Sequence, residues 1–241
     1  MFPFAVALII VLGFGLVVYA RESRPAADAS APTIDDHWHH SYGFYLCDTW
    51  FELDGDAEEQ DSTGFLNDEF RRTGVHSHGD GLIHWHAFTS AATGRNATLG
   101  VFLDVYGVEL TNTKLTFPES QRAGLPDGHD DGVYEEGETV CVIDGEEKDG
   151  SLKVVVWDNF SDTDGGTTFI ADFNNIRLDQ DGMAIAIAFV PDNTDVSLPP
   201  SAPELPTLAQ SDSGQLTPDD LFGGTDSVPA DSVPEDTAVD N

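Results

Sequence analysis

The chain has 241 residues, and its 44 acidic side chains against 10 lysine and arginine side chains give a formal net charge of −34 at pH 7. This charge excludes nucleic acid as a partner, because no basic patch can release counterions from phosphates. Divalent cations concentrate near such a surface whether or not a specific site exists.

The first predicted element is an apolar helix over residues 3–20, which contain no charged side chain. At about 1.5 Å per residue it would be roughly 27 Å long, enough to cross a bilayer and longer than the core of a signal peptide. We therefore expect residues 1–20 to be a transmembrane anchor or an uncleaved signal. A cleaved signal peptide is the alternative. A polar linker over 21–36 follows.

Two features of the sequence predict opposite orientations of this helix in the membrane. Arg21 and Arg24 follow the apolar segment, which by the positive-inside rule would place the rest of the chain in the cytoplasm. The abundant carboxylates and the two cysteines favour the outside. We expect a single-pass protein of the cell membrane with an extracytoplasmic domain, which has an envelope protein as its potential partner.

Residues 37–50 alternate in the manner of a β-strand, whose successive side chains point to opposite faces. Seven of the eight histidines lie here or in the segment 75–88. One predicted face consists of Trp38, His40, Tyr42, Phe44 and Leu46. The other consists of His37, His39, Ser41, Tyr45 and Cys47.

A hairpin is predicted over residues 75–88. It follows an acidic segment, the acidic excursion at 52–73, which is itself predicted to be a hairpin insertion. A two-residue Asp80-Gly81 turn would place His76 and His78 on one face and His84 and His86 on the other. A three-residue Gly79-Asp80-Gly81 loop would set His76 opposite His84, so that all four rings share a face. We favour the second register, because Gly81 suits the left-handed last position of such a loop.

Clustered histidines on one sheet face indicate a site for Zn²⁺ or Cu²⁺, which imidazole nitrogens bind well. The first candidate ligands are His76, His78, His84 and His86, and the second candidates are His37 and His39. Asp80 is a weaker candidate ligand. The competing interpretation is a non-catalytic interaction module of an envelope complex, in which the histidines pack or respond to pH.

The rest of the chain predicts one α+β domain over 37–191, mostly β with one main helix. The helix is expected over 98–110, where Leu99, Phe102, Leu103 and Tyr106 recur at helical spacing. Short strands are expected at 139–143, 152–157, 168–171 and 184–190. Residues 192–241 are rich in Asp, Ser, Thr and Pro, which predicts a disordered acidic tail.

Cys47 and Cys141 are the only cysteines. In an oxidising compartment one disulfide between them is the economical interpretation, and it would stabilise the fold by about 3–5 kcal/mol. The alternative makes Cys47 a metal ligand beside the first histidines.

None of the enzyme motifs that we considered is complete in this sequence. The run from His76 to Asp80 matches part of the H-x-H-x-D-H motif of metallo-β-lactamases, but the next residue is Gly81. No G-x-S-x-G, P-loop or Rossmann glycine pattern occurs. We expect no enzymatic activity, with an unrecognised metal-dependent hydrolase as the alternative.

Three segments carry a family resemblance: HWHHSYG from residue 37, GVHSHGDGLIHWHAF from residue 74 and TLGVFLDVYGVEL from residue 98. Together they resemble a poorly characterised group of bacterial membrane-anchored proteins with an H-x-H strand, an H-x-H-x-x-G-x-I-H-x-[EH] hairpin and a T-L-G-x-F-x-D-x-x-G helix. The resemblance covers about residues 37–190 and implies an extracytoplasmic, β-grasp-like α+β domain. His86 stands where related sequences often have glutamate, and the 52–73 excursion is longer than expected.

Overall fold

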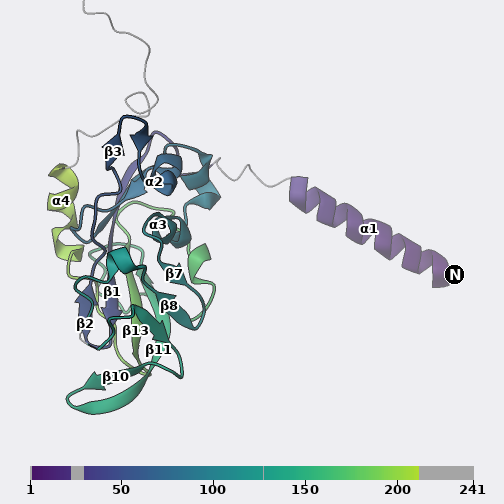
Figure 1. Ribbon diagram of the computed structural model, residues 1–241. Coiled ribbons are helices and arrows are strands. Elements are labelled where there is room, and N and C mark those ends of the chain that lie inside the picture. The colour runs from purple at the N-terminus through teal and green to yellow at the C-terminus, as the bar shows by residue number, and fades with distance from the viewer. Residues whose placement is uncertain (1, 23–29, 127, 212–241) are drawn as a thin grey trace, which may run out of the picture.

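The computed structural model describes residues 2–22, 30–126 and 128–211. It is a single, mostly β domain of mixed sheets with a few short helices (Figure 1). This architecture agrees in outline with the α+β fold class expected from the sequence. The helices are α1 (Phe2–Glu22), α2 (Asp68–Thr73), α3 (Leu99–Val105) and α4 (Leu205–Ser211). The β-grasp-like arrangement stays a prediction.

The strands are β1 (His37–Leu46), β2 (Thr49–Phe51), β3 (Gln60–Asp61), β4 (Gly64–Phe65), β5 (Val75–His76), β6 (Leu82–His86), β7 (Glu109–Leu110), β8 (Lys114–Thr116), β9 (Val133–Glu135), β10 (Val140–Ile143), β11 (Glu146–Trp157), β12 (Thr167–Phe169) and β13 (Ala184–Pro191). The main sheet has the order β10-β11-β13-β1-β6-β5, with β12 on β11 and β2 on β1. β1 and β13 are parallel, and β1 and β6 are antiparallel.

The core lies on the apolar face of β1, where the predicted alternation is confirmed. Tyr42 and Phe44 are fully buried. The Tyr42 ring meets Phe102 of α3 at 4.7 Å between ring centroids, and the Phe44 ring meets Phe117 at 4.9 Å. Burial of such aromatic side chains is worth about 1.5–3 kcal/mol each, so this face anchors α3 to the sheet.

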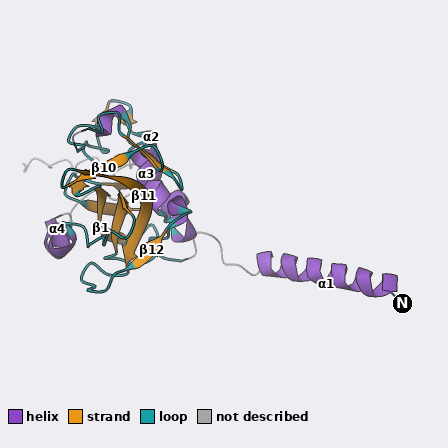
Figure 2. Cartoon of the chain, turned by 90° about the horizontal axis from the view of Figure 1, so that it is seen from below, coloured by secondary structure: helices purple, strands orange, loops and turns teal. Residues whose placement is uncertain are grey.

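The opposite face of the sheet is covered by the segment after β13. Val196 and Leu198 pack with Trp50 on a second apolar cluster of β11 and β13. The buried Ser201 hydroxyl lies 2.7 Å from the Ser41 hydroxyl. α3 and α4 lie on opposite sides of the main sheet (Figure 2). The expected disorder is therefore wrong for 192–211, and the rest of the predicted tail, 212–241, lies outside the described residues.

Several other boundaries differ from the sequence expectations. The helix ends at Val105, and Glu109–Leu110 instead forms β7, which begins a separate β7-β8-β9 sheet that was not predicted. The acidic excursion contains the expected short hairpin, β3-β4, and also the unpredicted helix α2. Asn67 begins α2 by accepting a hydrogen bond from the N–H of Phe70, and Gly74 ends it in a left-handed conformation.

Cys47 and Cys141 form the predicted disulfide, so the alternative of Cys47 as a metal ligand is wrong. α1 coincides with the apolar segment expected to be helical. Within the residues described above, no helix is both long and apolar enough to cross a membrane. The transmembrane part of the expected architecture is thus not supported, and the localisation of the protein stays a prediction.

Candidate metal centre

Strand pairing gathers five of the histidines on one face of the main sheet. β1 pairs with β6 so that His39 lies opposite His84 and His37 lies opposite His86. β6 also pairs with β5, which sets His76 opposite His84. Because side chains alternate along a strand, these rings all lie on the face of the sheet opposite to Trp85 and Ile83. β1 therefore lies directly beside the hairpin, which brings His37 and His39 next to the rings of β6.

The connection between β5 and β6 runs over Ser77–Gly81, five residues rather than the predicted three. The favoured register still holds, since His76 faces His84 and Gly81 has a φ of 73°. The pairing of β5 with β6 stops at His76, because the backbone of Ser77 forms hydrogen bonds with Tyr106 instead. Its N–H donates to the Tyr106 hydroxyl at 2.8 Å, and that hydroxyl donates to the Ser77 carbonyl at 2.9 Å.

His76, His78 and His84 form what we call the inner triad, whose potential ligand atoms lie within 4.8 Å of one another. His76 Nε2 and His78 Nε2 are 3.2 Å apart. Two nitrogens bound to one tetrahedral Zn²⁺ at about 2.0–2.1 Å would be separated by about 3.3 Å. The spacing of this pair therefore suits a shared ion.

The His76 ring is set for ligation by its other nitrogen. His76 Nδ1 lies 3.3 Å from the Gly74 carbonyl oxygen, which can only accept, so the proton belongs on Nδ1 and Nε2 keeps its lone pair. Burial, followed by the neighbouring rings of the same cluster, holds the pKa of His76 well below its ordinary value. The ring is consequently neutral at pH 7, which is the form that binds metals.

Two carboxylates border the inner triad. Asp80 Oδ2 lies 3.1 Å from His84 Nε2, and Glu58 Oε1 lies 3.7 Å from His76 Nε2. Burial alone would raise the pKa of Asp80, but the hydrogen bond and charge of His84 hold it below its ordinary value. An ionised Asp80 and Glu58 would offset the two positive charges of a divalent ion at a site where His76 and His84 are only 2% and 1% exposed.

His37, His39 and His86 form the second group, which we call the outer triad, and its potential ligand atoms also lie within 4.8 Å of one another. His37 Nε2 and His39 Nε2 repeat the 3.2 Å separation seen in the inner triad. His37 is exposed and His86 is half-buried, whereas His39 is buried. The N–H of His39 donates to Asp181 at 2.8 Å, which anchors this part of β1.

The six predicted histidines are thus brought together, but as two triads rather than as one four-histidine set with two further candidates. His86 belongs with His37 and His39, because His78 lies in the loop and turns its ring back towards His76. Asp48 lies beyond the opposite end of β1 and is not part of either triad. Glu58 was missed, since nothing in an acidic loop distinguishes one glutamate from its neighbours.

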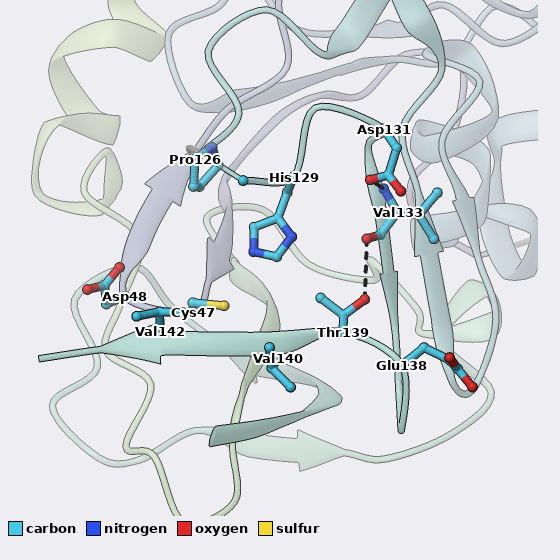
Figure 3. A pocket seen from close by; sticks show the side chains of 11 residues that line it. Cys47, Asp48, Pro126, His129, Asp131, Val133, Glu138, Thr139, Val140 and Val142 are labelled. Atoms are coloured by element: carbon cyan, nitrogen blue, oxygen red, sulfur yellow. Dashed lines mark hydrogen bonds between the residues drawn. The ribbon is translucent and has the colours of Figure 1, made fainter. Parts of the chain in front are cut away.

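A separate pocket lies beside the disulfide and has a volume of about 420 Å³ (Figure 3). His129 points into it from the loop that follows Pro126, and Asp48, Asp131 and Glu138 supply carboxylates at its walls. The half-buried His129 ring contacts Tyr134 at 4.7 Å between ring centroids, with the two rings tilted by 37°. The pocket lies beyond the C-terminal end of β1, whereas His37 and His39 of the outer triad lie at the N-terminal end of this strand.

No protein-family model, no curated protein and no solved structure matches this chain. The family resemblance drawn from the histidine motifs stays a prediction, and the functional argument depends on the site alone.

Proposed function

We propose that the inner triad binds one divalent transition-metal ion, Zn²⁺ or Cu²⁺, through His76, His78 and His84. The observation that carries this proposal is the 3.2 Å separation of His76 Nε2 and His78 Nε2, with His76 Nδ1 directed at a backbone carbonyl. Glu58 is close enough to complete a four-coordinate site, and Asp80 holds His84 or joins the ion directly.

The proposed role is retention of the ion, for metal buffering, metal sensing or a structural site, and not catalysis. Two of the three rings are almost fully buried, which favours slow exchange over turnover of a substrate. The Cys47–Cys141 disulfide supports an extracytoplasmic, oxidising compartment, where disulfides persist.

Calorimetric titration with Zn²⁺ tests the proposal, and about 0.5 M salt should be present to screen the carboxylate surface. We expect one tight site in the native protein. A His78→Ala/His84→Ala variant should weaken it at least about 100-fold, more than the loss of an outer-shell partner would. His129→Ala, which removes the histidine outside the sheet cluster, should leave it unchanged. Weak binding that is abolished by salt and identical in all three proteins would contradict the proposal.

The competing interaction-module hypothesis gives a different result in the same series. It requires metal-free protein to capture one fixed envelope partner, and it requires the triad variant to lose that capture without any change in Zn²⁺ binding.

A further inference from the structure

We infer that the outer triad binds a second divalent transition-metal ion, so that the histidine face carries a dinuclear centre with two unequal sites. This inference deepens the proposed function and rests on it for the first ion. The second ion would be held by His37, His39 and His86, none of which belongs to the inner triad.

The first argument is that each triad has its own complete set of ring nitrogens. The 3.2 Å Nε2-to-Nε2 separation occurs once in each triad, between His76 and His78 and between His37 and His39. The potential ligand atoms lie within 4.8 Å of one another inside each triad, but the two triads do not merge into one such group, so the two pairs do not surround a single ion. The duplicated geometry therefore corresponds to two ions.

The second argument is that the two triads are neighbours on the same sheet. The His39 ring of the outer triad lies edge-on to His84 of the inner triad, with 5.0 Å between ring centroids. His86 and His76 make a second contact between the triads at 5.5 Å. Adjacent strands are about 4.8 Å apart and alternate residues about 7 Å apart, so two ions on this face would lie within about 10 Å of each other.

The third argument is that the two sites differ in burial and charge. The inner triad has two buried rings and two flanking carboxylates, which retain an ion and offset its charge. In the outer triad His37 is exposed and His86 is half-buried. Water and small chelators reach the outer ion more readily, so the outer ion should load and leave first.

Cu²⁺ is the most suitable probe, because it binds imidazole tightly and its electron-spin resonance signal reports the distance to a second Cu²⁺. The full chain would be loaded with Cu²⁺ in about 0.5 M salt, freed of excess metal and examined for stoichiometry and for dipolar coupling. Two single variants at exposed rings, His37→Ala for the outer triad and His78→Ala for the inner triad, are least disruptive to the fold. His129→Ala is the control.

We expect two bound ions with dipolar coupling in the native protein and in His129→Ala. Each triad variant should retain one ion with an uncoupled signal. A chelator should release Cu²⁺ from the native protein in two phases, and His37→Ala should lack the faster phase.

The inference is overturned if native protein and His37→Ala both bind one ion, or if two ions bind without coupling. The same data separate it from the proposed function. One ion that is lost in His78→Ala and kept in His37→Ala supports the inner site and refutes the outer one. One ion that is lost in His37→Ala and kept in His78→Ala refutes the inner site and the dinuclear centre together. No bound ion refutes both proposals.

Discussion

The Tyr106 hydroxyl makes two hydrogen bonds to the backbone of Ser77, accepting from its N–H at 2.8 Å and donating to its carbonyl at 2.9 Å. Tyr106 is the C-cap residue directly after α3, and Ser77 lies between two proposed ligands, His76 and His78. This pair therefore connects the helix on the core side of the sheet to the geometry of the inner triad.

Tyr106→Phe should weaken binding of Zn²⁺ at the inner triad by about 3–30-fold and lower the free energy of unfolding by about 1–3 kcal/mol. The reason is that a buried N–H and a buried carbonyl lose their partner at Ser77. Ser77→Ala is the matched control, because it keeps both backbone contacts and removes only the longer contact from the Tyr42 hydroxyl. Calorimetry and urea unfolding measure the two effects, and equal Zn²⁺ affinity in Tyr106→Phe and native protein would contradict this role.

Gly81→Ala should destabilise the protein by about 1–3 kcal/mol more than Gly79→Ala. Both glycines have left-handed backbones, with φ of 73° and 69°, so both substitutions carry a similar backbone penalty. At Gly81 an added Cβ would lie 2.7 Å from Glu52 Oε1 and from Ser201 Cβ, whereas at Gly79 the nearest atom is 3.9 Å away. Thermal unfolding compares the stabilities of the two variants. Equal losses of stability would contradict the prediction and would show that the tip of the hairpin moves to accommodate the added Cβ atom.

Acid should destabilise the metal-free protein through His40. Burial, with a smaller contribution from the charge of His39, lowers the pKa of His40 to about 3 from an ordinary value of 6.5. Between these two values the unfolded state binds a proton that the folded state does not, so the free energy of unfolding falls as the pH falls below 6.5. The slope contributed by this single group approaches about 1.4 kcal/mol per pH unit.

His40→Phe removes this slope while keeping an aromatic ring between Trp38 and Trp85, each of which contacts the His40 ring at 6.2 Å between ring centroids. Between pH 6.5 and 4.5 the variant should lose about 2–3 kcal/mol less than native protein. Chelator-treated samples unfolded in urea at several pH values give the comparison, with His129→Ala as control. Parallel pH profiles of the His40→Phe variant and native protein would refute the assignment.

Removal of the disulfide should lower the free energy of unfolding by about 3–5 kcal/mol, because the bond closes a long loop of the unfolded chain. The two cysteines are 94 residues apart in sequence. A Cys47→Ala/Cys141→Ala variant should unfold at lower denaturant concentration and become insensitive to reductant. Its Zn²⁺ affinity should be unchanged, since the triads lie at the other end of β1, and a large loss of affinity would show that the two ends are coupled.

The shared face of the histidines was predictable, because it follows from the period of two along a strand and from the Gly79-Asp80-Gly81 sequence. The division of the histidines into two triads was not predictable from the sequence. It depends on the position of His78 in a loop, and Tyr106 holds this loop through a contact between residues 29 positions apart. Glu58 reaches His76 through the fold of the acidic excursion, which likewise has no local signal.

The error over residues 192–211 has a different origin. This segment is poor in apolar side chains, which predicted disorder, but those it has are placed where the sheet needs cover. Ala202 and Leu205 are almost completely buried, and Ser201 donates to the Gly81 carbonyl at 2.8 Å. The amino-acid composition of a segment is an average over all its positions. It therefore does not show that a few buried residues are enough to order the segment against the sheet.

The most direct test of the central claim is anomalous X-ray diffraction at the zinc absorption edge from crystals of the full chain grown with Zn²⁺. We predict a strong anomalous peak about 2.0–2.1 Å from the Nε2 atoms of His76 and His78 and within bonding distance of His84. Peaks confined to surface carboxylates, with no density among these three rings, would contradict the account.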